Sequence, residues 1–504
     1  MDTCTFPVKL AYGLPDQQTP QILVIDSHRE LIYRLTGDHR TIWNAIDGKR
    51  SIAHIIQKTG LPLVQVKTAL FDLETKGLVQ RQIRAEVLLV AAPPAQGLVD
   101  NQHPGWPLGI LYLAAALEKA GLLVAVLDPT SFEDAVVGLR TSQYQILGIS
   151  SVTSTFPNAA SLAQFSYSQR PAIPIVLGGM HVSARPEQSI EETRVPVTVV
   201  TGEAELVAPT IFRNLLEKGI GQSQIVSGQP VDELDSIPWP ARHLIDPDNY
   251  QGCSILSSRG CIGNCYFCAC RGFRTYRSRK VAAVLEEVRY LKEEMGMLDL
   301  IFEDDMFPFP PDRVRKICRG IQAIGGIQFG IQARGDMDLS LLPLLAEAGC
   351  QIIHFGVETG SPDIFARIGK GRVTLQQYLI AIKTALDCGI KVATSFIIGH
   401  PGETLATIED TRRLALDLVE HGVTVAISTM TPLPRTPLGD SPEKFGLIPR
   451  YQRGKENWTE RDVDCKGLPD FDLPELSTEQ IAEEAHKLVL ECADVRKGGD
   501  EDGD

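Results

Sequence analysis

Short apolar runs and helical spacing alternate along the first part of the chain. Residues 22–26 (ILVID) and 30–35 (ELIYRL) have the length and composition of two β-strands joined by a turn. Apolar residues then recur at helical intervals in three segments, 41–46, 51–60 and 63–79. This order, a β-hairpin followed by three helices and a short closing strand, predicts a small winged-helix-like module over residues 1–84.

Residues 85–228 alternate buried strands with helices. The run 85–94 (AEVLLVAAPP) is continuously apolar, as expected of a strand that is buried on both faces. An amphipathic helix is expected at 109–121, where Gly121 ends it. Further strands are expected at 122–128, 146–150, 173–179 and 197–202. Strands alternating with helices predict an α/β domain with a parallel, doubly wound sheet.

Ligands of such a sheet bind at the carboxyl ends of its strands. The candidate contacts at those ends are Pro93, Ser150, Ser151, Thr153, Gly178, Gly179, His181, Gly202 and Glu203. No Gly-x-Gly-x-x-Gly sequence opens the first helix, which disfavours a dinucleotide. A scaffold that binds nothing, or another nucleotide, is the alternative.

A stretch rich in Pro and Asp, 229–252, lacks clear periodicity and is expected to link two domains. About six further strand–helix units follow over 253–440. Sites in strand–helix barrels form from the loops after the strands. Chemically capable residues end successive strands here: Glu303, Asp304, Asp305, Arg334, Glu358, Gly399, Pro401 and Gly402. Residues 441–504 are expected to form a helical extension, begun by a capping box of Ser477 and Gln480, and an acidic disordered tail.

Composition narrows the functional classes. The 504-residue chain is 43% hydrophobic and has a formal net charge of −14 without a long Lys/Arg-rich run, so nucleic-acid binding is not expected to be its main task. No apolar stretch reaches membrane-spanning length, and the N-terminus lacks the features of a signal peptide. The 11 scattered cysteines favour a reducing, cytoplasmic location over a disulfide framework.

Three cysteines, Cys261, Cys265 and Cys268, have the spacing Cys-x-x-x-Cys-x-x-Cys within SSRGCIGNCYFCACRGF. Three thiolates on one loop can bind three irons of a cubane cluster and leave the fourth open, whereas most ferredoxin-type sites use four cysteines. A structural zinc loop with Cys270 as fourth ligand is the alternative, but no histidine follows nearby. The spacing therefore favours the cluster, and Cys270 is expected to be a buried or supporting thiol.

The cysteine loop and the strand–helix units after it resemble the radical S-adenosylmethionine (SAM) superfamily. This resemblance implies a partial (β/α)6 barrel over 253–440, a [4Fe-4S] cluster on the three cysteines, and SAM chelated to the open iron. Glu303, Asp304 and Asp305 stand where the family binds the SAM amino group, although FEDD replaces the common Gly-Gly-Glu. The resemblance also implies that the SAM carboxylate pairs with Arg334, that Glu358 accepts from the ribose or amino group, and that the nucleoside lies against Gly399, Pro401 and Gly402.

Residues 85–228 resemble the cobalamin-binding domain that precedes many radical SAM domains. The matching sequences are PLGILYLAAALEKAG, SSVTST, GGMHVS and TGEAE. The resemblance implies that cobalamin binds at the strand ends given above. The Asp-x-His-x-x-Gly motif of that family is absent between 85 and 240, so bound cobalamin is expected to lack a histidine ligand.

Residues 1–84 resemble the PqqD-like family through their apolar spacing and through Trp43, Asp47 and Gly48. That family includes modules that bind the leader peptides of ribosomally made, modified peptides, and such modules can add a peptide strand to a hairpin edge. The implied partner is a leader peptide. A structural cap that packs on the next domain is an equal alternative.

Together these resemblances imply a radical SAM enzyme that uses cobalamin, most simply a C-methyltransferase acting on an unactivated carbon of a small molecule or peptide. An electron donor such as flavodoxin or ferredoxin is the implied redox partner. A non-methylating oxidation, cyclisation or rearrangement is the first alternative. A peptide-recognition scaffold with an inactive enzyme domain is the second, although it would have no need of three spaced thiols. A methylthiotransferase is disfavoured because no second cysteine triad occurs in the N-terminal half.

Overall fold

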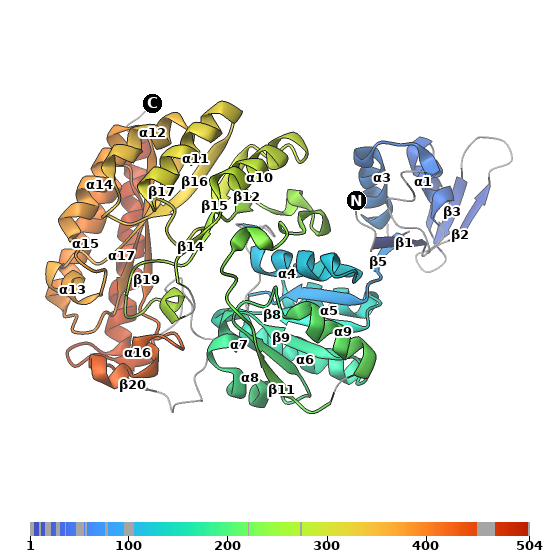
Figure 1. The fold of residues 1–504 in the computed structure, drawn as a ribbon, viewed down its shortest axis with the longest axis horizontal. Helices are drawn as coiled ribbons and strands as arrows, with labels where there is room; N and C mark the ends of the chain where they lie inside the picture. Colours follow the sequence, from blue (N-terminus) through green and yellow to red (C-terminus); the bar gives the residue numbers. More distant parts are fainter. Residues whose placement is uncertain are drawn as a thin grey trace.

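The computed structural model describes residues 5–9, 12–15, 22–26, 31–35, 37–46, 55, 58–75, 79–94, 105–219, 221–272, 275–450 and 469–501. Two α/β domains lie side by side, and a small N-terminal module stands to one side of them (Figure 1). Within the described residues, no helix is both long and apolar enough to cross a lipid bilayer.

The N-terminal module contains the predicted hairpin. Strand β3 (Ile22–Asp26) pairs antiparallel with β4 (Leu31–Leu35) and, on its other edge, with β2 (Tyr12–Pro15). Helices α1 (Gly37–Ala45) and α3 (Leu63–Thr75) contact each other, and β5 (Val79–Ile83) pairs with β1 (Thr5–Lys9). The module has its own core, which includes Ile42, Trp43 and Leu70. The helix expected at 51–60 lies mostly outside the described residues.

The first α/β domain has the predicted parallel sheet. Its strands are β6 (Val87–Ala91), β7 (Val124–Leu127), β8 (Ile146–Ser150), β9 (Ile175–Gly178), β10 (Thr198–Thr201) and β11 (Gln224–Ser227). Their order is β11-β10-β9-β8-β6-β7, and every neighbouring pair is parallel. Strand β11 was not predicted, because QIVS is an exposed edge strand without a continuous apolar run.

Helices cover both faces of this sheet. The helices are α4 (Leu108–Lys119), α5 (Phe132–Thr141), α6 (Phe156–Gln169), α7 (Met180–Ala184), α8 (Pro186–Thr193) and α9 (Ala208–Lys218). Leu89 and Val200 share one core with Leu111 of α4 and Phe212 of α9, and that core continues into the second α/β domain. The chain reverses direction across the sheet between β6 and β8, which is where ligands of doubly wound sheets bind.

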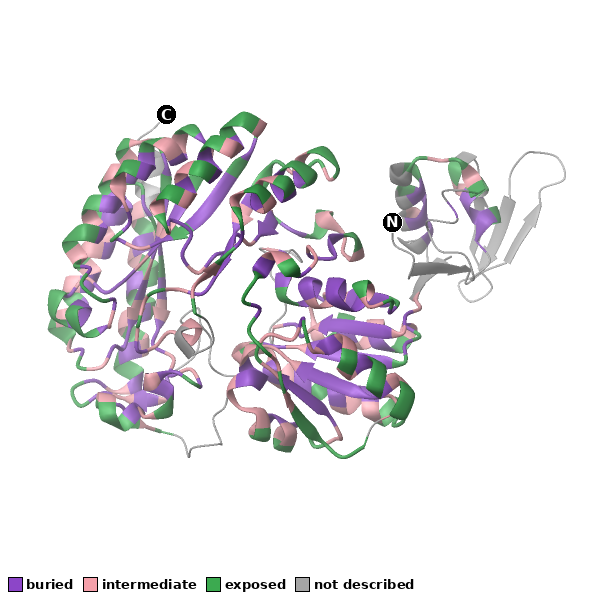
Figure 2. Ribbon diagram, in the orientation of Figure 1, coloured by how far each residue is buried: buried purple, intermediate pink, exposed green. Residues whose placement is uncertain are grey.

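The second α/β domain is the predicted partial barrel. Its strands are β12 (Cys253–Ile255), β15 (Asp299–Phe302), β16 (Gln328–Ala333), β17 (Cys350–Glu358), β18 (Lys391–Ile398) and β19 (Thr424–Thr429). They pair in chain order and all run parallel. The outer helices are α10 (Val281–Glu293), α11 (Pro311–Ile324), α12 (Leu342–Glu347), α13 (Pro362–Arg367), α14 (Leu375–Asp387) and α15 (Leu405–Glu420). Figure 2 shows the central strands largely buried and the outward helix faces exposed.

The segment between the two domains is packed rather than loose. Val231, Leu234 and Ile237 are buried in the core that both domains share, and short 3-10 turns punctuate the segment. This packing could not be predicted from the sequence, because isolated apolar residues among Pro and Asp give no periodic signal.

The C-terminal helix covers one edge of the barrel. Helix α17 (Thr478–Glu501) contacts α15 and β19. Its first turn has the predicted capping box, since Ser477 N donates to Gln480 Oε1 (2.9 Å) and Gln480 N donates to Ser477 Oγ (3.3 Å).

Candidate functional site

The three cysteines lie on one loop that begins and ends in a short antiparallel stem. Strand β13 (Ser258–Arg259) precedes the loop, and its partner β14 (Arg277–Ser278) follows it. Cys261, Cys265 and Cys268 are half-buried cysteines. Tyr266 helps to attach the loop to the barrel: its N donates to Ile368 O (3.1 Å), and its hydroxyl hydrogen-bonds to His400 Nδ1 (2.5 Å).

This set of thiols fits a cubane cluster bound by three cysteines. Cys270 donates to Asp305 Oδ1 (3.0 Å) and is thereby held by a carboxylate, which agrees with its expected supporting role. Burial raises the pKa of Cys265 to about 11, with the Lys370 ammonium opposing part of the rise, so the thiolate needs a bound cation to form at neutral pH. Within the described residues no three His, Cys, Asp or Glu side chains converge on one ion. A cubane cluster does not require that convergence, because each cysteine binds a different iron.

The three consecutive acids after β15 have different surroundings. Asp304 is fully buried and accepts from Ser257 N (2.7 Å), Ser257 Oγ (2.5 Å) and Ser258 Oγ (2.5 Å). Asp305 accepts from Gly260 N (2.8 Å) as well as from Cys270. Both acids thus hold the stem and start of the cysteine loop. The sequence pattern had grouped them as contacts to a ligand, and it could not show that two of them are engaged by this loop.

Glu303 faces the first α/β domain. Its Oε1 accepts from Ser254 Oγ (3.1 Å), whose oxygen also accepts from Trp106 N (3.0 Å). A Cβ on Gly105 would lie 2.9 Å from Glu303 Oε1, so the backbone at Gly105 comes close to this carboxylate. Burial raises the pKa of Glu303, which lines the cavity described below.

Two predicted residues at the next strand ends do lie beside the cysteine loop. Arg334 is bound to Asp336 through Nε and Nη2 (3.0 Å each), and its Nη1 would be 2.6 Å from a Cβ on Gly263, which lies between Cys261 and Cys265. Glu358 has a φ of 78°, a left-handed value that is rare outside glycine and is often found at functional sites. The pair brings one guanidinium and one carboxylate to the loop.

Lys370 completes this group and was not expected. Its ammonium is buried and lies 3.0 Å from Glu358 Oε1 and 3.3 Å from the Tyr378 hydroxyl. The next residue back, Gly369, is packed so closely that a Cβ there would lie 2.7 Å from Asn264 O in the cysteine loop. A lone lysine between two glycines in RIGKGR has no periodic or motif signal, so only the fold could reveal it.

The turn after β18 contains Gly399, Pro401 and Gly402. Gly399, with a φ of 102°, would place a Cβ 3.1 Å from Ile481 and 3.4 Å from Phe471, so C-terminal side chains pack against it. A Cβ on Gly402 would likewise lie 2.6 Å from Arg367 Nη1. Pro401 lies between them and is partly exposed. Close protein packing thus surrounds the Cβ positions of these glycines, and the approach of their backbone to a nucleoside stays a prediction.

Glu403 follows this turn and was also missed. Its Oε2 accepts from Gly399 N (2.6 Å) and His400 N (3.0 Å), which fixes the turn from which His400 reaches Tyr266. Burial raises the pKa of Glu403 to about 8 and lowers that of His400 to about 3. The arrangement locks the cysteine loop to the end of β18.

A cavity of about 630 Å³ separates the carboxyl ends of the first sheet from the barrel. Its walls are mostly apolar, and they include Leu89, Val176 and Phe212 between the sheet and helices α4 and α9. Leu256, Arg259 and Glu303 form the barrel side. The cavity thus extends from the switch point of the first sheet to the stem of the cysteine loop. A mostly apolar cleft with few polar groups is typical of a cofactor site.

Six of the nine residues predicted from the first sheet line this cavity: Ser150, Ser151, Gly178, Gly179, Gly202 and Glu203. Gly179 has a φ of 99°, and a Cβ there would lie 2.2 Å from Ser151 O, so this wall is made of closely packed backbone.

The other three are not among the lining residues. Pro93 accepts an N–H from Asn158 through its carbonyl (3.0 Å), and Thr153 belongs to a 3-10 turn. His181 is fully buried and stacks on Phe156, with ring centroids 4.2 Å apart. Burial lowers the pKa of His181 to about 4.

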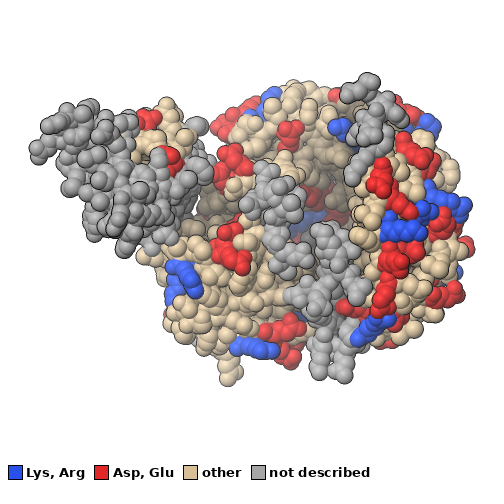
Figure 3. Space-filling model, turned by 180° about the vertical axis from the view of Figure 1, so that it is seen from behind, with Lys and Arg blue, Asp and Glu red and all other residues tan. Residues whose placement is uncertain are grey.

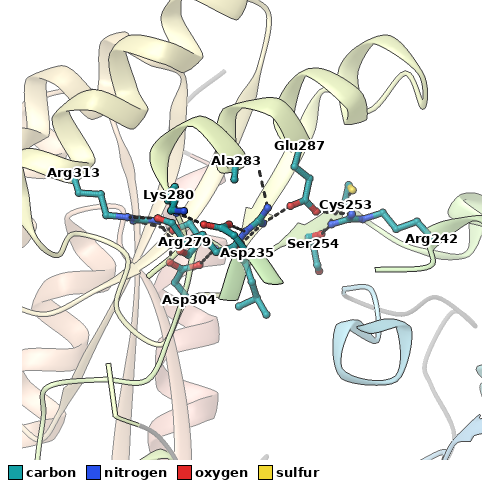
Figure 4. Close-up of polar contacts among 12 residues, drawn as sticks. Asp235, Arg242, Cys253, Ser254, Arg279, Lys280, Ala283, Glu287, Asp304 and Arg313 are labelled. Atoms are coloured by element: carbon teal, nitrogen blue, oxygen red, sulfur yellow. Dashed lines mark hydrogen bonds and ion pairs between the residues drawn. The ribbon is translucent and has the colours of Figure 1, made fainter. Parts of the chain in front are cut away.

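A buried network of charges supports the other side of the stem (Figure 4). The side chain of Glu287 in α10 is fully buried, and its Oε1 lies 2.6 Å from Arg242 Nη1. Glu287 also pairs with Arg279, the residue after β14. Arg279 additionally pairs with Asp235 (3.3 Å), so the interdomain segment, the stem and α10 are joined. Arg313 donates to Ser257 O (2.6 Å) on the strand side.

Two family models match this chain. The radical SAM superfamily model matches residues 255–415, and the B12-binding domain model matches residues 101–212. An uncharacterized methyltransferase of Pyrococcus horikoshii is 30% identical over 381 residues, which are 70% of this chain and 82% of the relative. Cytidylyl-2-hydroxyethylphosphonate methyltransferase of Streptomyces wedmorensis is 26% identical over 370 residues, covering 59% and 69%. Anaerobic magnesium-protoporphyrin IX monomethyl ester cyclase of Rubrivivax gelatinosus is 26% identical over 355 residues, covering 64% and 63%.

Solved structures share this fold. The radical SAM methyltransferase TsrM of Kitasatospora setae, with cobalamin and a [4Fe-4S] cluster bound, aligns with a TM-score of 0.59 at 19% identity and covers 73% of this chain and 81% of its own. The cobalamin-dependent SAM radical enzyme OxsB, with aqua-cobalamin and SAM bound, aligns with a TM-score of 0.63 at 18% identity and covers 94% and 75%. These likenesses establish the arrangement of the two α/β domains.

Proposed function

The chain belongs to the radical SAM superfamily and carries a B12-binding domain ahead of its radical SAM domain, and from this we propose that it is a cobalamin-dependent C-methyltransferase. Its cofactors are a [4Fe-4S] cluster, SAM and cobalamin. The proposed reaction places a methyl group on an unactivated carbon of a small molecule or peptide.

One observation carries the proposal: a single cavity connects the ligand end of the first sheet to the stem of the cysteine loop. A cofactor in that cavity and a cluster on the loop would face the same barrel opening. Methyl transfer to a carbon radical needs this proximity, since a reactive intermediate must meet its partner before it meets solvent.

The described residues fit these cofactors. Cys261, Cys265 and Cys268 would hold the cluster, while Arg334 and Glu358 offer opposite charges for the carboxylate and amino groups of SAM. The backbone at Ser150, Gly179 and Gly202 would contact the corrin. When bound, the cluster supplies an electron for SAM cleavage and cobalamin supplies a methyl group.

The chain's own side chains position these groups and exclude water. The contacts of Asp304, Asp305 and Tyr266 hold the cysteine loop in place from three directions. Cofactor enzymes derive much of their selectivity from such fixed geometry.

A non-methylating reaction is the second candidate. The relative named as a monomethyl ester cyclase covers 64% of this chain, so this combination of domains occurs in a protein named for ring formation. The same cavity and loop would serve either chemistry, and the fate of the methyl group distinguishes them.

The N-terminal module is the part of the chain that we propose to bind a peptide substrate. Its antiparallel sheet has β2 and β4 as outer strands, and an extended peptide can add to such an edge. We include a PqqD-like role in leader-peptide binding on that basis, together with an external one-electron donor. On the face shown in Figure 3, acidic and basic side chains are interspersed without a continuous basic surface, as suits a protein whose main ligand is not nucleic acid.

The test follows the methyl group of SAM and requires no knowledge of the substrate. Anaerobic holoenzyme is incubated with methyl-labelled SAM and a strong reductant, and the corrinoid fraction is then separated in the dark. Label in the corrinoid supports methyl transfer. Cleavage of SAM without label in the corrinoid would reject the methyltransferase and favour the non-methylating reaction.

A further inference from the structure

Four charged side chains join the cavity wall to the stem of the cysteine loop. We call Glu203, Glu205, Arg259 and Arg277 the clasp. The two glutamates follow β10 of the first domain, and the two arginines stand opposite each other in the β13–β14 pair that carries the loop. The clasp is therefore a contact between the two domains at the point where the cysteine loop begins and ends.

Glu203 is fully engaged within the clasp. Its Oε1 lies 2.6 Å from Arg277 Nη2, and its Oε2 accepts from Arg277 Nη1 (3.0 Å) and from Val231 N (2.6 Å). Both oxygens of this carboxylate are satisfied by the protein. The sequence had marked Glu203 as a cobalamin contact, but its lone pairs are directed at the stem and the interdomain segment.

Glu205 is only half engaged. Its Oε1 accepts from Arg259 Nη2 (2.7 Å), while its buried Oε2 has no hydrogen-bond partner among the residues that the structure describes. The side chain is 8% exposed and lines the cavity. A buried carboxylate oxygen without a donor is costly, so a residue kept in this state is expected to meet a donor from a ligand.

Arg259 is not free to supply that donor. Its Nη1 lies 3.5 Å from Glu203 Oε1, and its guanidinium carbon sits 5.0 Å from the centre of the Tyr112 ring. The guanidinium is thus held by two carboxylates and an aromatic face. The Glu205 side chain, whose Oε2 has no donor among the described residues, also belongs to the lining of the cavity.

We propose that Glu205 is a corrinoid-binding residue, whose Oε2 accepts an N–H from one of the carboxamide groups at the periphery of the corrin. This inference rests on the proposed function, because it takes the cavity to be the corrinoid site. A carboxylate that accepts from a neutral amide makes a charge-assisted hydrogen bond, which is stronger than a neutral one. Since Arg259 lies two residues before Cys261, the same carboxylate connects the corrinoid to the start of the cysteine loop.

The test measures corrinoid affinity directly. Full-length protein made without cobalamin is titrated with hydroxocobalamin, and bound ligand is determined by equilibrium dialysis. In Glu205→Gln the side chain keeps its volume and a carbonyl for Arg259 but loses the charged acceptor. Its dissociation constant is expected to rise about tenfold, the size of effect for one hydrogen bond to a charged group. Glu217→Gln, on the exposed face of α9, is the matched control and should stay within twofold of wild type.

The outcomes separate this inference from the proposed function. Wild-type protein that binds no hydroxocobalamin would overturn both. Wild-type binding with Glu205→Gln within twofold would overturn the role of Glu205 alone. If thermal unfolding shows that Glu205→Gln is not folded, Glu205→Asp takes its place, because it keeps the charge beside Arg259 and withdraws the carboxylate by one methylene. The same tenfold loss is expected there, and affinity within twofold would again overturn the role.

Discussion

Asp304 has a structural role, which comes from the hydrogen bonds that its carboxylate accepts inside the protein. It is fully buried, and three donors from Ser257 and Ser258 satisfy it. Burial raises its pKa, and these hydrogen bonds oppose the rise. The acid therefore orients the strand that leads into the cysteine loop.

Asp304→Asn should weaken the protein and its hold on the cluster. The side-chain amide would place an NH2 group against one of the donors from Ser257 or Ser258. Because that hydrogen bond is lost, the free energy of unfolding should fall by about 2–3 kcal/mol. Denaturant unfolding and the iron content of anaerobically purified protein measure the two effects. Asp312→Asn, on the first turn of α11, is the control. Unchanged stability and iron in Asp304→Asn would refute this role.

His181 predicts a pH dependence of stability. Its folded pKa is about 4, below the usual value of about 6.5, because burial disfavours the charged ring. A lowered pKa contributes stability that is present above pH 6.5 and is lost as the pH falls toward 4, by up to about 3 kcal/mol. Unfolding of the cluster-free triple variant Cys261→Ala/Cys265→Ala/Cys268→Ala, with and without His181→Phe, isolates this effect. Equal pH profiles of the two proteins would contradict the assignment.

At the scale of single residues, the sequence could identify site residues that belong to a local motif. It could not identify residues that come together only when distant parts of the chain fold. The cysteine spacing is local, and so the loop could be located directly. Lys370 and Glu205 contact residues that lie 12 and 54 positions away in the chain, and neither belongs to a periodic pattern. Asp304 and Asp305 were expected beside a ligand because they end a strand, whereas their lone pairs are taken by the neighbouring loop.

At the scale of elements, a buried carboxylate of helix α10 ties that helix to the stem of the cysteine loop. Glu287 pairs with Arg242 and Arg279, and none of the three side chains is more than 5% exposed. Removal of one member of a buried ion pair leaves charge without compensation.

Glu287→Ala should lower the free energy of unfolding by about 3–5 kcal/mol, since Arg242 would lose its buried carboxylate and Arg279 would be left with Asp235 as its carboxylate partner. Glu286→Ala, at the adjacent exposed position on α10, should change it by less than about 0.5 kcal/mol. Thermal and denaturant unfolding of both variants test this. A similar small loss in each would show that the network contributes little.

Most strands could be predicted because buried parallel strands are continuous apolar runs. Strand β11 could not, because it lies at an exposed edge. The interdomain segment was expected as a linker, yet Arg242 within it is buried against both domains. Isolated residues of this kind gain their role only when two domains meet.

At the scale of the whole molecule, the N-terminal module has a core separate from the cores of the α/β domains. Deletion of residues 1–78 should therefore leave iron and corrinoid contents within about a fifth of wild type, since, among the described residues, the core of the module is separate from the cores around the cofactor sites. Metal analysis and absorbance spectra check this result. Loss of either cofactor from a folded, truncated protein would instead assign the module a structural role.

The central claim is that one chain holds a cluster on three cysteines and a corrinoid in the cavity beside them. The direct measurement is iron, sulfide and corrinoid per chain, in protein purified without oxygen from cobalamin-fed cells, for wild type and for Cys261→Ala/Cys265→Ala/Cys268→Ala. We expect about four irons per chain in wild type, their loss in the triple variant, and corrinoid in both. Iron without corrinoid in the wild type would contradict the methyltransferase, and iron retained in the triple variant would contradict the cluster site.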